Sequence, residues 1–127
     1  MRRPDKREQR RSNPPLEYDR ELLRGNTDSL LLYLIHESGR IHGYRLIKDI
    51  QQRSGGFFKF REGTVYPALH KLESDGLILG EWQVQPTGQQ RRYYTLTEKG
   101  EEVLLKRISM WFKFSNAMNL ILKPVHN

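Results

Sequence analysis

The residues with chemical potential in this chain are basic and aromatic side chains rather than catalytic groups. Cysteine is absent and the four histidines show no His-x-x-x-His spacing, so the sequence predicts no metal site. Neither a Gly-x-Ser-x-Gly segment nor a glycine-rich phosphate loop is present, and we expect no enzyme and no cofactor. The 127 residues carry a net charge of +7. Small basic domains favour polyanions, nucleic acid before anionic membranes.

The segment from residue 61 to residue 76 predicts a helix that could read double-stranded DNA. Val65, Leu69 and Leu72 fall on one face of this helix, which leaves polar side chains on or near the other. A start at Thr64 would keep Pro67 in the first turn, whereas a start at Arg61 would place Pro67 deeper and bend the helix. The candidate DNA contacts of this segment are Arg61, Thr64, Tyr66, His70 and Lys71.

A β-hairpin is expected next, because two stretches of β-forming residues at 77–84 and 91–96 flank a Pro- and Gly-containing turn. Gly88 in this turn would allow a close approach to DNA, and Arg91 and Arg92 supply positive charge. Successive strand residues point to opposite faces. We therefore expect at most one of the two arginines to reach DNA well, and the other to brace the core or an acidic neighbour.

Short helices are expected to position these residues. The sequence predicts a helix that begins with Thr27 or Asp28 as its cap and ends near Ser38, and a second at residues 43–52; a short turn at 18–24 precedes them. The order of elements predicts a mainly α fold with a small β-hairpin, namely a winged helix-turn-helix followed by a long C-terminal dimerisation helix. The third helix would enter a major groove and the hairpin tip a neighbouring groove.

The last predicted helix, at residues 97–122, carries an apolar seam with heptad spacing. The seam residues are Leu104, Ile108, Trp111, Ser115, Met118 and Leu122. At ~1.5 Å per residue the helix would be about 40 Å long, more than a domain of this size covers. Packing on the first helix of the same chain is one alternative, and packing on a second copy is the other. We expect both, with the first half on its own domain and the rest across a homodimer.

The chain divides into three predicted segments. Residues 1–16 form an arginine-rich, disordered arm that could lie along phosphates, enter a minor groove, or serve only as a solubilising tail. Residues 17–96 form the DNA-binding domain, and residues 97–127 the dimerisation helix and tail. No run approaches the ~20 apolar residues of a membrane span, and no secretory signal is recognised. The chain is therefore expected in the cytoplasm, without a membrane partner.

Several segments resemble the PadR family of bacterial transcriptional regulators. They are residues 21–27, 42–44, 63–73 and 92–97, in register across roughly residues 19–105. The resemblance implies a homodimeric repressor of the subgroup with a single C-terminal helix. It also implies that Tyr66 and Tyr44 lie near the DNA backbone; the alternative is that both are core aromatic residues whose hydroxyl groups reach solvent. Glu62 departs from the family, which often has Pro there, so the third helix could begin differently here.

The resemblance also implies a site for a small aromatic effector, because some members bind flat aromatic ligands between their subunits. Trp111 and Phe112 are the candidates here, although an aromatic pair on a dimer seam can equally be a packed interface. We expect a repressor that blocks polymerase at a pseudo-palindromic operator. The alternative from another class is a winged-helix protein-interaction adaptor without specific DNA binding.

Overall fold

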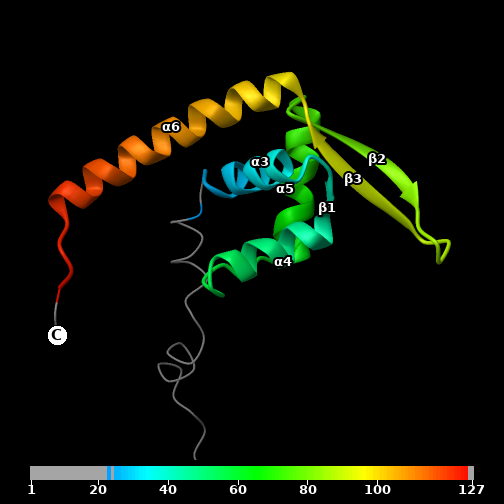
Figure 1. Ribbon diagram of the computed structural model, residues 1–127, viewed down its shortest axis with the longest axis horizontal. Helices are drawn as coiled ribbons and strands as arrows, with labels where there is room; N and C mark the ends of the chain where they lie inside the picture. Colours follow the sequence, from blue (N-terminus) through cyan, green and yellow to red (C-terminus); the bar gives the residue numbers. More distant parts are fainter. Residues whose placement is uncertain (1–22, 24, 126–127) are drawn as a thin grey trace, which may run out of the picture.

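The computed structural model describes residue 23 and residues 25–125. The predicted arm at residues 1–16 therefore lies outside the described residues, and so does the predicted turn at residues 18–24 except for Leu23. His126 also lies outside them. Within the described part, helices and a small sheet alternate along the chain (Figure 1). The elements are α3 (Thr27–Ser38), β1 (Ile41–His42), α4 (Gly43–Arg53), α5 (Glu62–Ser74), β2 (Ile78–Val84), β3 (Gln90–Leu96) and α6 (Glu98–Ile121).

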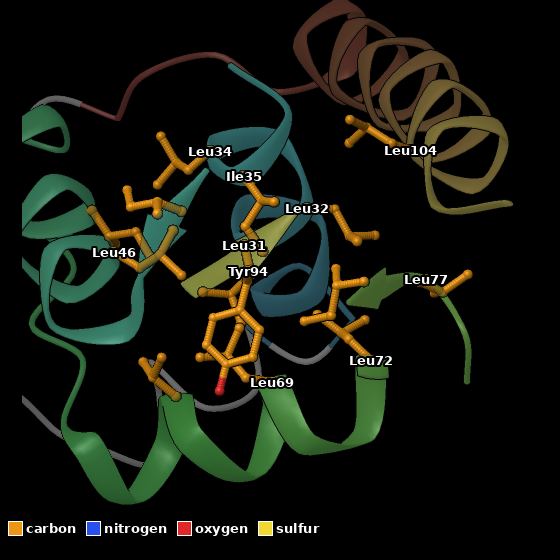
Figure 2. Packing of buried hydrophobic residues seen from close by; sticks show 14 of the residues in the cluster. Leu31, Leu32, Leu34, Ile35, Leu46, Leu69, Leu72, Leu77, Tyr94 and Leu104 are labelled. Carbon is orange, nitrogen blue, oxygen red and sulfur yellow. The ribbon is translucent and has the colours of Figure 1, made fainter. Parts of the chain in front are cut away.

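The core lies between α3, α4, α5 and the sheet. Leu31, Leu32 and Ile35 of α3 are fully buried at its centre. Figure 2 shows Tyr94 of β3 among the leucines that α3 and α5 contribute. The buried cluster consists of Leu31, Leu32, Leu34, Ile35, Ile41, Leu46, Ile50, Phe60, Val65, Leu69, Leu72, Leu77, Ile78, Tyr94 and Leu104. Apolar residues at helical spacing thus fix which faces of α3, α4 and α5 point inward.

One helix start differs from the sequence prediction, and a second decides between two starts that the sequence left open. The cap residue of α3 is Asn26, not Thr27 or Asp28. The chain already turns at Leu23, whose carbonyl accepts hydrogen bonds from the Asn26 N–H at 2.8 Å and the Thr27 hydroxyl at 3.4 Å, so Thr27 is already helical. The second is α5, which begins at Glu62 with Arg61 as its cap, close to the earlier of the two predicted starts. Pro67 therefore lies inside the helix and lacks the N–H that would bond to the Gly63 carbonyl.

The sheet has three antiparallel strands in the order β1-β3-β2, rather than the predicted hairpin alone. β2 and β3 form that hairpin, which is called the wing below, with Trp82 opposite Arg92. The added strand β1 pairs Ile41 with Tyr94. In the turn of the wing, Gly88 has φ +87°, a conformation that glycine adopts without strain.

The long helix α6 begins on the domain and then leaves it. Leu104 is buried against the core and Ile108 is partly buried, and α6 packs on α3 in this region. Figure 1 shows that α6 then continues past the rest of the domain. Beyond Ile108 the large apolar side chains are exposed, as expected for a helix whose second half needs another partner. None of the described helices is long and apolar enough to cross a membrane.

Candidate nucleic-acid interface

The third helix, α5, has one buried and one exposed face. Val65, Leu69 and Leu72 are buried at a spacing of four and three residues, which confirms the predicted inward face. Most of the remaining side chains lie at the surface, whereas Ala68 packs against the core and Glu73 binds Arg92. Those predicted to contact DNA are all exposed, namely Arg61, Thr64, Tyr66, His70 and Lys71.

Tyr66 lies where α5 passes the start of α4. Its ring packs on Gly43, because a Cβ at that glycine would be only 2.7 Å from the Tyr66 Cε1. Partial burial, and then the carboxylate of Glu62, raises the pKa of Tyr66, against the opposing effect of Arg91. The phenol therefore stays protonated at neutral pH. It can donate a hydrogen bond to an acceptor such as a phosphate oxygen.

Tyr44, the second tyrosine of the resemblance, lies at the surface of the first turn of α4 and is half-exposed. Its ring stacks on His42, with centroids 6.5 Å apart, and the Lys48 ammonium lies 4.8 Å from its centroid. The structure thus places both tyrosines at the surface and neither in the buried core. Lys48 and its neighbour Arg45, which forms an ion pair with Asp49 at 3.0 Å, add positive charge to this helix.

His42 has a structural role that sequence reasoning missed, since the chain's histidines were weighed there as metal ligands and only His70 as a DNA contact. Its Nδ1 accepts the Arg45 backbone N–H at 3.1 Å and so caps α4. Burial, and then the charges of Arg91 and Arg45, lower the pKa of His42. A neutral ring whose Nδ1 accepts must carry its proton on Nε2. That Nε2, which is 3.4 Å from the Arg91 guanidinium, therefore cannot accept from it.

The two arginines of the wing point to opposite faces, as predicted. Arg92 donates to both carboxylate oxygens of Glu73 on α5, at 2.9 and 2.6 Å. It is the arginine that braces an acidic neighbour. Arg91 is exposed, and no carboxylate lies within ion-pair distance of it among residues 25–125. Arg91 is thus the wing cation that remains available to phosphate.

Other basic and polar groups extend the same region. Arg40 donates to the Gln83 side chain at 2.6 Å and covers the Tyr93 ring at 4.5 Å, a contact for which the sequence carried no signal. Gly88 lies exposed in the turn at the tip of the wing. In the described part of the chain, no group of three or more His, Asp or Glu side chains could hold a metal ion.

The predicted dimer seam and effector site lie on α6, except that the last seam residue, Leu122, follows the end of the helix in an extended conformation. Leu104 and Ile108 are used by the chain's own domain, whereas Trp111, Met118 and Leu122 expose 45%, 40% and 59% of their surface. Trp111 and Phe112 meet edge to face, with centroids 5.4 Å apart. Both rings are open to solvent in a single chain, so any enclosed ligand site there would need a second chain.

Comparisons of the sequence and of the structure with known proteins agree on one family. The profile of the "Transcriptional regulator PadR-like family" matches residues 31–106. Transcriptional regulator Rv3488 of Mycobacterium tuberculosis is 33% identical over 75 residues, which cover 58% of this chain and 66% of the relative. A transcriptional regulator from Clostridium thermocellum has a similar structure, with a TM-score of 0.73, 26% identity, and coverage of 81% of this chain and 99% of the other.

A third relative is known together with its ligand. The negative transcriptional regulator PadR of Bacillus subtilis is 30% identical over 66 residues, which cover 52% of this chain and 36% of that protein. The structure of Bacillus subtilis PadR in complex with operator DNA has a TM-score of 0.58 and 25% identity, and the match covers 79% of this chain and 49% of the other.

Proposed function

Because the chain belongs to the PadR-like family of transcriptional regulators, we propose that it is a dimeric, sequence-specific DNA-binding repressor that acts at a pseudo-palindromic operator. The family consists of regulators and not of enzymes. The match of this chain to it spans the helices and the wing that form the candidate interface. The operator complex of the Bacillus subtilis relative supports DNA as the partner.

One observation carries the proposal, which is that the exposed face of α5 and the exposed Arg91 of the wing form one surface. The Tyr66 ring packs on Gly43, and the Arg91 guanidinium lies 3.4 Å from Nε2 of His42, the residue before Gly43, so helix and wing approach each other at this point. In the proposed complex, Thr64 and His70 meet base edges in a major groove. Tyr66, Tyr44, Arg61 and Lys71 contact phosphates.

The wing supplies the second contact of each protomer. Arg91 would contact the backbone at the neighbouring groove, and Gly88 would let the turn approach closely. Because phosphate contacts release counterions, binding should weaken steeply as salt is raised. The basic arm at residues 1–16 lies outside the described residues, and its contact with DNA stays a prediction.

The second half of α6 is the proposed dimer contact. A partner helix would cover Trp111, Ser115, Met118 and Leu122, and the twofold symmetry would place two half-sites about 10 bp apart. A dimer on such a site would block polymerase, in the bacterial cytoplasm where the DNA lies. A small aromatic effector between Trp111 and Phe112 of the two chains would tilt the reading heads and release the operator.

Selection of bound duplexes from random DNA sequence at about 150 mM salt tests the proposal, with the mass in solution measured in parallel. An enriched palindrome bound by a dimer is the expected result. A folded dimer that enriches no sequence would favour the adaptor alternative. A salt-insensitive complex would also contradict the proposed surface, because phosphate contacts could not then dominate binding.

A further inference from the structure

A cluster of four residues connects the wing to the last turn of the recognition helix α5. We call it the wing brace; it consists of Glu73 on α5, Gly80 and Trp82 on β2, and Arg92 on β3. We propose that Arg92 is a positioning residue, which through Glu73 fixes the angle of the wing relative to α5. The proposal rests on the function proposed above, because that angle matters to DNA held by both elements.

The central contact of the brace is an ion pair in which one guanidinium nitrogen donates to both carboxylate oxygens. Arg92 Nη2 lies 2.9 and 2.6 Å from the two carboxylate oxygens of Glu73. The two side chains are only 27% and 26% exposed, so solvent screens the pair less than it screens an open surface pair. The guanidinium also lies over the Trp82 ring, so its orientation as well as its distance from Glu73 is restricted. The pair therefore resists both lifting and rotation of the wing.

Gly80 and Trp82 shape the space around that ion pair. A Cβ at Gly80 would lie 2.5 Å from the Arg92 Nε and 2.7 Å from a Glu73 carboxylate oxygen, so any other residue there would displace the ion pair. Trp82, directly opposite Arg92 in the sheet, places its ring 5.4 Å from the guanidinium. The guanidinium thus has a carboxylate partner on α5 and an aromatic ring on β2, which leaves it poorly placed to bind phosphate.

The brace contacts α5 far from the start of the helix, so a small change in the contact changes the angle between the wing and α5. Glu73 lies in the last turn of the helix, nine residues after Thr64, which corresponds to about 13 Å along the axis. Arg92 lies near the turn end of β3, so the brace holds this half of the wing to the last turn of α5. The adjacent Arg91 lies beside His42, and Tyr66, nearer the other end of α5, packs on Gly43. A fixed angle lets α5 and the wing reach successive grooves together. Loss of the brace should weaken specific binding without removing a phosphate contact.

A charge swap distinguishes positioning from direct contact. We expect Arg92→Glu and Glu73→Arg each to weaken binding to the selected operator about tenfold, and the double swap to recover most of it. Arg92→Lys keeps the charge but loses the planar guanidinium that lies over Trp82 while it binds Glu73, so it should weaken binding with an unchanged salt dependence. Arg91→Ala is the matched control on the same strand and should lower the salt slope by about 0.9 per wing. If Arg92 contacts phosphate, Arg92→Lys binds normally and the swap stays weak, which would overturn the proposal.

Hydrogen exchange of the protein without DNA tests the brace independently of the DNA-binding results. Backbone amides of β2 and β3 should exchange hydrogen faster in Arg92→Glu and Arg92→Lys, and at the original rate in the swap and in Arg91→Ala. Unchanged exchange in both Arg92 variants would refute the brace. Failure of the original protein to select any operator would refute the proposed function instead. Circular dichroism of every variant confirms that the helices remain folded.

Discussion

Trp111 is the strongest single test of the proposed dimer, because it follows directly after the part of α6 that the domain covers. It exposes 45% of its surface in one chain, and a tryptophan buries up to about 250 Å². Some 110 Å² thus remains for a partner, equivalent to about 3 kcal/mol at ~25 cal/mol per Å². Because an alanine would still bury part of this area and packing at an interface is incomplete, we expect Trp111→Ala to reduce the free energy of dimerisation by about 2 kcal/mol per copy.

The change Trp111→Ala should therefore cost the dimer about 4 kcal/mol, because the twofold interface contains the side chain twice. This corresponds to a rise of about a thousandfold in the dissociation constant of the dimer. Sedimentation velocity over a range of protein concentrations measures it. The half-sites of an operator should then bind independently, with lower affinity.

Met110→Ala is the matched control, since Met110 exposes 66% of its surface but lies off the heptad seam. We expect it to leave the dissociation constant within about threefold of the original, as is usual for surface changes. If Trp111→Ala leaves the dimer intact, or if both variants weaken it equally, the assignment of the seam is wrong.

Three further predictions concern the reading surface and its support. Arg91→Ala should weaken binding to all sequences alike and lower the salt slope, measured by fluorescence anisotropy at several salt concentrations; a change confined to one operator sequence would contradict a phosphate contact. Tyr66→Phe should remove about 1 kcal/mol per site in the same assay, and Gly43→Ala, which displaces the Tyr66 ring, at least as much; normal binding by both would exclude this contact. The pKa of His42 is lowered in the folded protein, so the unfolded chain binds its proton more readily and stability should fall as pH drops below the ordinary value of 6.5. His42→Asn keeps an acceptor for the cap but does not titrate, so its melting temperature should fall less over this pH range, and an equal fall would contradict the assignment.

The sequence was sufficient for the helices and for the exposed face of α5, because both follow from apolar periodicity. Val65, Leu69 and Leu72 mark the inward side of α5, and this alone leaves Tyr66 and His70 at the surface. The heptad seam likewise predicts that α6 extends beyond the part of the domain that can cover it. The division of α6 into a covered and an exposed half follows the length of the domain, as expected.

Features that depend on long-range partners could not be predicted in this way. β1 has only two residues, too few for an alternating pattern, and it exists because β3 offers an edge beside Ile41. Glu73 and Arg92 are 19 residues apart and lie on different elements, so no local spacing indicates their pairing. His42 acts as a cap because the chain before it is extended, and a single histidine carries no such signal in the sequence.

The fate of the positive charge shows why net charge alone is a weak guide to the interface. In the part of the chain that the structure describes, four arginines form ion pairs with carboxylates, namely Arg45, Arg53, Arg92 and Arg107. Arg61, Lys71 and Arg91 enter no ion pair there, and all three lie on α5 or the wing or directly beside them. The cations without a carboxylate partner thus include those on the elements that present Thr64, Tyr66 and His70. Affinity for phosphate should therefore depend on these three cations, whereas removal of a paired arginine should weaken DNA binding only by disturbing the fold. The adjacent residues Arg91 and Arg92 allow the two effects to be compared directly.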